Sequence, residues 1–146
     1  MKIVIQRVKN ASVSVDTQVV GQIQKGMVIL LGVDKDDTEK DLDYCVKKCA
    51  ELRMFEDEQD KMNLCAKEVD GAALVVSQFT LLGNCDKGRR PSFDAAADPQ
   101  KGEEFYNLFV EKLKQQGICV ETGRFRAMMD VALINDGPVT FVIESK

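Results

Sequence analysis

The sequence contains no histidine. Imidazole is the usual general base for serine and cysteine nucleophiles, and it is also a common metal ligand. Its absence excludes Ser-His and Cys-His catalysis, together with every metal site that needs a histidine. Any catalysis by this chain must therefore find its proton acceptor elsewhere.

The cysteines offer neither a disulfide framework nor a zinc framework. There are five, with no Cys-x-x-Cys pair among them, and an odd set of this kind fits reduced thiols. Cys45 and Cys49 could share one face of a helix as metal ligands, but no second pair and no histidine accompany them. We therefore interpret both as small core residues and expect no metal.

Long hydrophobic runs are also missing. The longest, residues 27–33, is interrupted by Gly32 and is far shorter than the roughly 20 apolar residues of a membrane-spanning helix. The first four residues lack the apolar core and cleavage site of a signal peptide. We therefore expect a cytoplasmic protein that has no contact with a membrane.

The chain has no excess of positive charge. Its net charge of −4 argues against nonspecific coating of nucleic acid, which depends on clustered Lys and Arg. A local basic cluster exists nevertheless at residues 87–90. The sequence contains neither G-x-G-x-x-G nor a Walker loop, so we expect no nucleotide cofactor. A length of 146 residues with 45% hydrophobic residues predicts one domain over residues 1–146.

Hydrophobic patterning predicts both strands and helices. The predicted strands cover residues 2–8, 12–16, 19–23, 27–33, 72–76, 118–121, 128–134 and 139–144. A turn at residues 9–11 would join the first two strands as an antiparallel pair. Helices with one apolar face are expected from Asp36 to about Met54 and from Pro99 to about Gln116. This order predicts an α+β (mixed α/β) fold, with two main helices packed on a mostly antiparallel sheet.

Two loop segments separate these elements. Residues 55–61 are acidic but lack the ordered alternation of a calcium-binding EF-hand, so we interpret them as a solvated hairpin or loop. Residues 84–97 are expected to form a long loop that carries the basic cluster.

Ser77-Gln78-Phe79-Thr80 follows directly on a buried strand. If the strand continued, its alternation would place Ser77 and Phe79 on one face and the other two residues on the opposite face. Polar residues at the end of a buried strand are held rigidly, which suits chemistry. They also suit a purely structural strand end whose hydroxyls bond to backbone.

Asn135-Asp136-Gly137 has the composition of a tight hairpin turn between two apolar runs. Pro138 follows where a strand should resume, although proline lacks an N–H and fixes φ. Two interpretations remain from these residues alone: a plain turn, or a rigid kink that presents backbone carbonyls.

Several motifs occur in order along nearly the whole chain. They are Gln6-Arg7-Val8 with Ala11-Ser12-Val13, Leu52-Arg53-Met54-Phe55-Glu56-Asp57, Lys61-Met62-Asn63-Leu64, Ser77-Gln78-Phe79-Thr80-Leu81, Lys87-Gly88-Arg89-Arg90-Pro91-Ser92-Phe93, Thr122-Gly123-Arg124-Phe125 and Asn135-Asp136-Gly137-Pro138-Val139-Thr140. With these motifs the chain closely resembles the D-aminoacyl-tRNA deacylase family of chiral-proofreading enzymes. It departs from the family pattern at Arg126, where Gly or Ala is frequent, and at Asp86, where a basic residue is usual. These departures concern only details of substrate entry or tRNA contact.

The resemblance implies a homodimer with its active site at the subunit interface. Residues 77–80 of one subunit would face a cis Gly137-Pro138 peptide of the other. It also implies hydrolysis of the ester that joins a D-amino acid, or glycine, to the terminal ribose of tRNA. The expected partners are thus D-aminoacyl-tRNA and glycyl-tRNA.

For catalysis we expect Ser77, Gln78, Phe79 and Thr80 to be the relevant residues. An aminoacyl ester is already activated, so backbone N–H groups of Phe79 and Thr80 aimed at the developing oxyanion would suffice. The missing base would be the ribose 2′-hydroxyl of the substrate, which restricts the activity to RNA. The rival mechanism makes Thr80 a covalent nucleophile.

For chiral selection we expect the carbonyls of Gly137 and Pro138 to collide with an L side chain. Arg7 would hold this segment by hydrogen bonds to its carbonyls, and Phe125 and Met129 would line the adenosine or side-chain pocket. The alternatives are a surface arginine in an ordinary salt bridge for Arg7, and plain core packing for Phe125 and Met129.

Lys87, Arg89 and Arg90 are expected to bind tRNA phosphates, unless this loop is only a solvated turn. Two other functions fit the same residues. One is a non-catalytic module that binds tRNA ends or a D-amino acid, which a test of ester turnover would separate from an esterase. The other is a dimeric scaffold without a small-molecule site.

Overall fold

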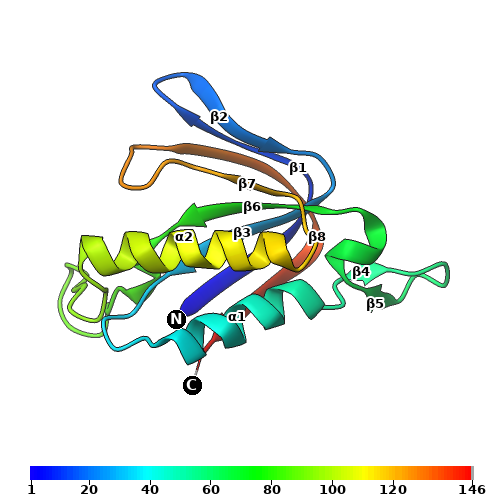
Figure 1. Cartoon of the computed structure of the whole chain (residues 1–146). Helices are drawn as coiled ribbons and strands as arrows, with labels where there is room; N and C mark the ends of the chain where they lie inside the picture. The colour runs from blue at the N-terminus through cyan, green and yellow to red at the C-terminus, as the bar shows by residue number, and fades with distance from the viewer. Residues whose placement is uncertain (146) are drawn as a thin grey trace.

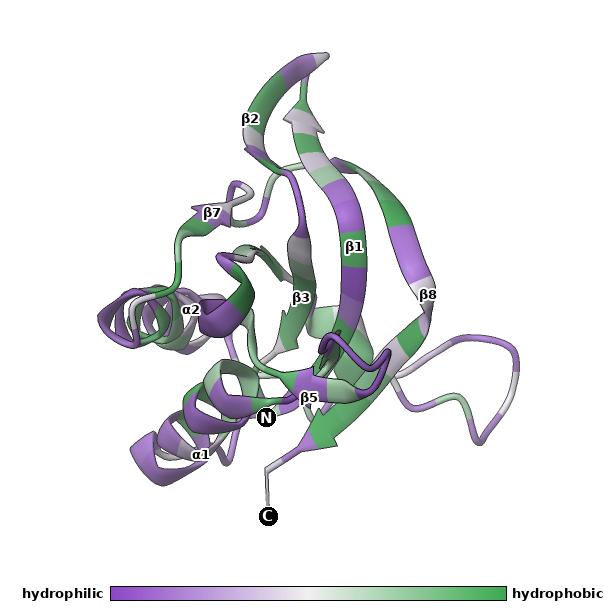
Figure 2. Cartoon of the chain, turned by 90° about the vertical axis from the view of Figure 1, so that its right-hand side faces the viewer, coloured by the Kyte–Doolittle hydropathy of each residue, from purple (hydrophilic) through white to green (hydrophobic). Residues whose placement is uncertain are grey.

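The computed structural model describes residues 1–145 and consists of a mixed sheet covered on one face by two helices (Figures 1 and 2). The strands are β1 (Lys2–Val15), β2 (Gln18–Ile23), β3 (Gly26–Gly32), β4 (Phe55–Glu56), β5 (Met62–Leu64), β6 (Ala72–Ser77), β7 (Val120–Thr122) and β8 (Asp130–Glu144). The helices are α1 (Glu39–Glu51) and α2 (Pro99–Gln115), with short 3-10 helices η1 (Ala66–Val69) and η2 (Phe79–Leu82). The strand order is β2-β1-β3-β6-β7, with β8 paired to β1, while β4 and β5 form a separate hairpin.

The predicted α+β class with two main helices on a sheet is confirmed, but the sheet is mixed rather than mostly antiparallel. Strand β1 is antiparallel to β2, β3 and β8. Strands β3, β6 and β7 are parallel to one another. Parallel neighbours need a crossover connection, which α1 provides between β3 and β6 and α2 provides between β6 and β7. Of the two forms considered for residues 55–61, the hairpin is the one observed.

Two predicted strand breaks are absent. Strand β1 is continuous, so the expected turn at residues 9–11 is wrong. Its first half pairs with β3 and its second half with β2, while β8 lies along both halves. Strand β8 is likewise continuous, so the plain hairpin turn, one of the two interpretations of residues 135–138, is wrong. In both strands, pairing on either side of the polar residues outweighs their local preference for a turn.

Strand β8 contains a bulge in place of that hairpin. Its register with β1 passes from Gln6 opposite Thr140 to Val8 opposite Asn135. Residues 136–139 therefore stand opposite Arg7 alone. A bulge leaves extra residues outside the ladder of hydrogen bonds and redirects their backbone groups.

The main core lies between the sheet and the two helices. In α1, the buried residues are those of the predicted apolar face: Leu42, Cys45, Val46, Cys49 and Ala50. Burial raises the pKa of Cys45 to about 11 and raises that of Cys49 as well. Their interpretation as core residues is confirmed. In α2, the buried side is centred on Tyr106, Phe109, Val110 and Leu113, whereas Phe105 and Leu108 from the predicted stripe are only partly buried.

A second core cluster lies apart from the first. It includes Val8, Val13, Val28, Leu74 and Val76, which come from β1, β3 and β6. The continuous apolar runs of β3 and β6 reflect this, because both strands contribute side chains to the two clusters.

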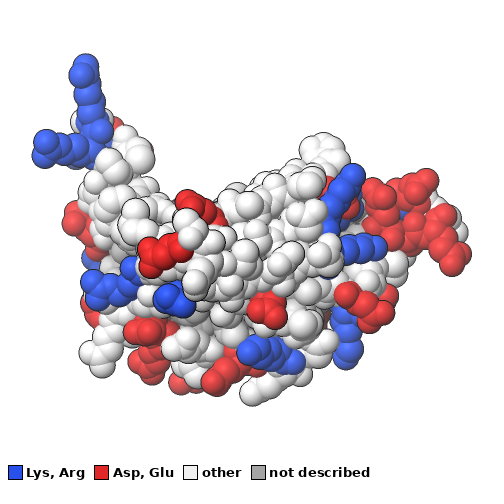
Figure 3. All heavy atoms as spheres, turned by 90° about the horizontal axis from the view of Figure 1, so that it is seen from above, with Lys and Arg blue, Asp and Glu red and all other residues white. Residues whose placement is uncertain are grey.

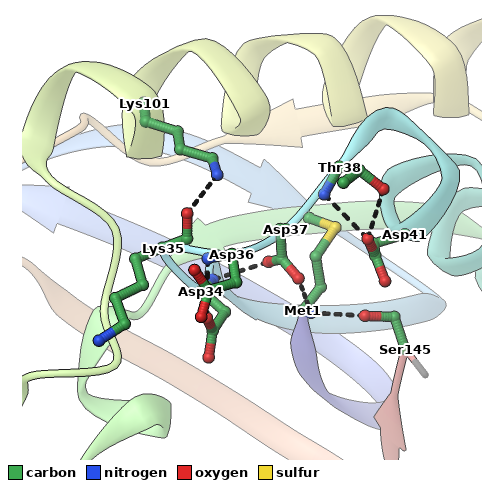
Figure 4. A network of polar contacts seen from close by, with 9 residues as sticks. All are labelled: Met1, Asp34, Lys35, Asp36, Asp37, Thr38, Asp41, Lys101 and Ser145. Carbon is green, nitrogen blue, oxygen red and sulfur yellow. Dashed lines mark hydrogen bonds and ion pairs between the residues drawn. The ribbon is translucent and has the colours of Figure 1, made fainter.

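A polar network joins the two ends of the chain to the start of α1 (Figure 4). The α-ammonium group of Met1 pairs with the buried carboxylate of Asp37 and donates to Ser145 Oγ at 2.6 Å. Asp37 Oδ2 also accepts the backbone N–H of Asp34 at 2.7 Å. This network anchors β1 and β8 beside the loop that leads from β3 into α1.

Asp41 stabilises the first turn of α1 through Thr38, the N-cap residue. Its carboxylate accepts hydrogen bonds from the hydroxyl and the N–H of Thr38, at 2.7 and 2.8 Å. These bonds lower the pKa of Asp41 to about 2. We expect Asp41→Asn to reduce the free energy of unfolding by about 0.5–2 kcal/mol near neutral pH, the usual size of a lost N-terminal cap.

This difference should depend on pH in a defined direction. Because folding lowers the pKa of Asp41, its contribution is complete above the unfolded pKa of about 3.9 and is lost as the pH falls toward 2. Urea unfolding of the wild type and of Asp41→Asn, from neutral pH down to about pH 2, measures this difference in the free energy of unfolding. Glu51→Gln at the far end of α1 is the control. A difference that stays constant with pH would contradict the assignment.

Candidate active site

Strand β6 ends at Ser77, and η2 begins two residues later with Phe79. The alternation expected for a strand through residues 77–80 is therefore wrong. The backbone N–H of Gln78 still donates to the carbonyl of Leu31 at 2.8 Å. Gly32 allows η2 to fold over the end of β3, because a Cβ on Gly32 would lie 2.4 Å from Leu82 Cδ2. Close packing of η2 on β3 thus accompanies the end of β6 at Ser77.

The start of η2 presents backbone donors beside an exposed aromatic ring. A 3-10 helix pairs each N–H with the carbonyl three residues earlier, so the N–H groups of Phe79 and Thr80 have no partner within η2. The Phe79 side chain is 56% exposed and contacts Phe93 edge to face, with ring centroids 5.1 Å apart. This combination of free donors and an exposed ring suits a substrate with a polar carbonyl and a planar group.

The hydroxyl groups of Ser77 and Thr80 have no general base beside them. Gln78 Nε2 donates a hydrogen bond to Thr80 Oγ1. Within residues 1–145, no acidic or basic side chain is hydrogen-bonded to Ser77 or Thr80. A threonine nucleophile requires a group that accepts its proton, so the protein on its own does not activate Thr80.

Arg7 lies on β1 and is only 5% exposed. It contacts two backbone carbonyls and two carboxylates, and one of the carboxylates is that of Asp136, 3.2 Å from Nε. Its Nε donates to the carbonyl of Asp136 at 3.0 Å, and its Nη1 donates to the carbonyl of Met54 at 2.8 Å. Its Nη2 lies 3.4 Å from Glu56 Oε1. The alternative of a surface arginine is therefore wrong. Arg7 connects the β8 bulge to the segment that leads into the β4–β5 hairpin.

Gly137 and Pro138 lie in the exposed part of the bulge, and the peptide bond between them is cis. Asn135 spans this part of the bulge: its Nδ2 donates to the carbonyl of Arg7 at 3.0 Å and to that of Val139 at 3.1 Å. A Cβ on Gly137 would lie only 2.3 Å from Asn135 Oδ1. In its observed conformation, the side chain of Asn135 therefore leaves no room for a Cβ at position 137.

Sequence reasoning did not identify the roles of Asn135, Met54 and Glu56. Asn135 was interpreted only as a turn residue, and the other two lie in the segment 52–57 without a sign that they contact Arg7. The position of all three in motifs of the resembled family was the only available signal. Their contacts cross from one element to another and have no local pattern in the sequence.

One chain does not bring residues 77–80 next to Gly137-Pro138. Arg7, opposite the bulge, pairs with Met27, whereas Ser77 pairs with Leu31. These two positions on β3 are four residues apart, or about 13 Å at the usual rise of a strand. The two segments therefore lie toward opposite ends of β3 (Figure 1).

Phe125 and Met129 lie between β7 and β8 and are both partly buried. Phe125 packs against the main core and contacts Tyr106, with ring centroids 5.9 Å apart. Met129 packs against the second cluster. Arg126, between them, has a φ of 60°, a left-handed conformation that glycine adopts more readily. The pocket role of Phe125 and Met129 stays a prediction.

Lys87, Arg89 and Arg90 are exposed in the loop between η2 and α2. Backbone hydrogen bonds of 2.8 and 2.9 Å between Asn84 and Ser92 close the base of this loop. Figure 3 shows Lys and Arg side chains projecting at one end of the molecule and Asp and Glu side chains gathered at the opposite end, where the β4–β5 hairpin lies. The basic loop follows η2 directly in the chain, and the ring of Phe93, just after the loop, contacts that of Phe79.

A cavity of about 710 Å³ lies beside the polar network of Figure 4. Its lining includes Asp34, Asp36, Asp37, Asp86 and Glu144, and it includes none of the predicted site residues. A wall with this much negative charge disfavours phosphate groups. The cavity is therefore a poor candidate for a nucleic-acid site.

Comparisons with known proteins agree with the sequence motifs. A family model described as D-Tyr-tRNA(Tyr) deacylase matches residues 4–144. D-aminoacyl-tRNA deacylases of Bacillus cereus (strain B4264) and Bacillus anthracis (strain A0248) are each 55% identical over 146 residues, which covers all of both chains.

Two solved structures have the same fold. The first, described as a c-Myc DNA unwinding element binding protein, is 40% identical, with a TM-score of 0.93 and coverage of 100% of this chain and 99% of that one. The second, described as a probable eukaryotic D-amino acid tRNA deacylase, is 16% identical with a TM-score of 0.84 and covers 98% of each chain. At that identity it supports the fold alone. The family match and the full-length relatives confirm the expectation from the motifs: the chain belongs to the D-aminoacyl-tRNA deacylase family and is a hydrolase.

Proposed function

We propose that this deacylase works as a homodimer that hydrolyses the ester of D-aminoacyl-tRNA, and also of glycyl-tRNA, while it rejects L-aminoacyl esters. The observation that carries the proposal is the start of η2, where two backbone N–H groups lack a helical partner and no side-chain base is present. Such a site is weak against an amide but suits an ester that is already activated. The substrate then supplies the missing base.

In this mechanism the N–H groups of Phe79 and Thr80 stabilise the oxyanion that forms when water attacks the ester carbonyl. The ribose 2′-hydroxyl beside the ester accepts the proton of the attacking water and passes its own proton to the ribose oxygen of the ester. That oxygen leaves as a hydroxyl when its bond to the carbonyl carbon breaks. Thr80 positions these groups, and its hydrogen bond from Gln78 supports this role. The rival, covalent attack by Thr80, lacks a proton acceptor in the protein.

Chiral selection falls to the Gly137-Pro138 segment. D and L substrates carry identical functional groups, so only a clash can separate them. The hydrogen bond from Arg7 to the carbonyl of Asp136 supports a segment held rigidly enough for that purpose. Glycine has no side chain to clash, which is why glycyl-tRNA is included as a substrate.

A homodimer is supported by the distance within one chain between residues 77–80 and Gly137-Pro138, which lie toward opposite ends of β3. Residues 77–80 of one subunit can meet a Gly137-Pro138 segment only if that segment belongs to a second copy of the chain. Strand β8 has β1 as its neighbour on one side and carries the exposed hydrophobic residues Val131, Ile134 and Val142. A sheet edge with exposed apolar side chains favours contact with a second copy.

The tRNA itself is bound by Lys87, Arg89 and Arg90 in the loop beside η2. Because the chain as a whole is negative, this local cluster provides the phosphate contacts, and binding should weaken as salt rises. Translation supplies the substrate, which places the activity in the cytoplasm. No helix within residues 1–145 is long and apolar enough to cross a membrane.

The test is hydrolysis of D- and L-tyrosyl-tRNA at equal enzyme concentration, each with a terminal 2′-hydroxyl or a 2′-deoxy ribose. We expect cleavage only of the D ester that has the 2′-hydroxyl. Equal cleavage of both ribose forms would show that the 2′-hydroxyl is not the proton acceptor. It would favour a mechanism in which Thr80 is the nucleophile and the protein supplies the base. Binding without cleavage of any ester would favour the non-catalytic module.

A further inference from the structure

We propose that Asn135 is a positioning residue that sets chiral selectivity, because it fixes the Gly137-Pro138 segment to β1. This inference rests on the proposed function, in which that segment rejects L substrates. It assigns the role to the amide of Asn135 rather than to a turn. The contacts of the amide, and not its place in a motif, carry the argument.

Both hydrogens of the Asn135 amide are used, one on each side of the segment. Nδ2 donates to the carbonyl of Arg7 on β1 and to the carbonyl of Val139, which follows Pro138. The opposite orientation of the amide would turn Oδ1 toward two carbonyl oxygens, so the observed orientation is the one that these acceptors require. Oδ1 is therefore directed toward Gly137.

Arg7 holds the same segment from its other end. While its carbonyl accepts from Asn135, its guanidinium donates to the carbonyl of Asp136. The segment between Asp136 and Val139 is thus attached to β1 at both ends, by two different side chains. Residues in a bulge lack regular ladder bonds, so these attachments decide where its backbone lies.

The location of Asn135 separates this role from a contribution to the core. Its side chain is partly exposed and belongs to neither hydrophobic cluster. Loss of its hydrogen bonds should therefore release the bulge while the sheet and the helices stay packed. Selectivity should change much more than stability.

The experiment compares kcat/KM for D- and L-tyrosyl-tRNA in Asn135→Asp and Asn135→Ala. The aspartate variant keeps the shape of the side chain but loses both donors. Asn10→Asp is the control, because residue 10 is exposed and pairs with Ile134 beside the bulge. We expect the ratio of D to L hydrolysis to fall at least about tenfold in both Asn135 variants and to stay unchanged in Asn10→Asp.

A second measurement is independent of activity. Gly137→Ala should shift the urea midpoint downward in the wild-type background, where its Cβ meets Asn135 Oδ1. The shift should shrink in the Asn135→Ala background, where that atom is gone, so the two substitutions should be non-additive.

The two measurements fail in distinguishable ways. Additive midpoint shifts would refute the contact between Asn135 and Gly137, and an unchanged D to L ratio in the Asn135 variants would refute the positioning role. If the wild-type protein leaves the D ester intact, the proposed function itself is wrong. The midpoint shifts then still decide whether Asn135 fixes the segment.

Discussion

Gly137→Ala should reduce hydrolysis of D-aminoacyl-tRNA about a hundredfold, because the proposed site also uses the Gly137-Pro138 segment to position the bound ester. A displacement of about 1 Å in such a segment has effects of that size. Gly137 does not have a left-handed φ, so the backbone itself accepts alanine. The obstacle is Asn135 Oδ1, which would lie 2.3 Å from the new Cβ.

Asn135 cannot yield without a cost elsewhere. If its side chain turns away, its hydrogen bonds to the carbonyls of Arg7 and Val139 are lost. If it stays, the bulge has to shift. In either case the carbonyls of Gly137 and Pro138 leave the place from which they act on the substrate.

The measurement is kcat/KM for D-tyrosyl-tRNA, with far-ultraviolet circular dichroism to verify the fold. Gly102→Ala is the matched control, because its Cβ would meet only Phe125 Cζ at an ordinary 3.5 Å. It lies inside α2, where alanine is favoured over glycine. If Gly137→Ala is nearly as active as the control, Gly137 does not belong to the active site.

Phe79→Pro should lower kcat by about a hundredfold to a thousandfold, the usual effect of removing one oxyanion donor. Proline is tolerated at the first position of a helix, since the N–H at that position has no partner in the helix. The substitution therefore removes the proposed donor while η2 still forms.

Phe79→Ala is the matched control for this variant. It removes the ring and its contact with Phe93 but keeps the backbone N–H. We expect it to raise KM more than it lowers kcat. Equal losses of kcat in the two variants would assign the effect to the ring and would exclude the N–H of Phe79 as the oxyanion donor.

The two variants Gly137→Ala and Phe79→Pro, both strongly impaired, together test whether each site is built from two subunits. In a homodimer with the proposed arrangement, a heterodimer of Gly137→Ala and Phe79→Pro chains has one site with both segments intact. Random assembly makes about half of the dimers heterodimers, so co-expression should restore about a quarter of wild-type activity per chain. Activity no higher than that of either variant alone would place both segments of a site in one chain.

The helices and the buried strands were predictable because their signals are local. Apolar residues at helical spacing identified the buried face of α1, and continuous apolar runs identified β3 and β6. The parallel pairing of these strands was not predicted, because it depends on how α1 and α2 cross over the sheet.

The errors have a common physical origin. Residues 9–11, 77–80 and 135–137 have local preferences that compete with contacts made by distant residues. Pairing between β1 and β8 on either side of the first and third segments keeps both strands continuous. The absence of a side chain at Gly32 leaves room for η2 over the end of β3. Propensity describes a segment alone, whereas the fold depends on its neighbours.

The sequence by itself determined which chemistry was excluded and which family the chain belongs to. The absence of histidine eliminated the common bases, and the ordered motifs identified a deacylase. Only the tertiary structure decided that Arg7 is buried against Asp136, that Asn135 spans the bulge, and that residues 77–80 lie far from Gly137-Pro138 within one chain. The physical reason is that composition and motif order are properties of the chain, while hydrogen bonds between separate strands depend on register, which no single segment encodes.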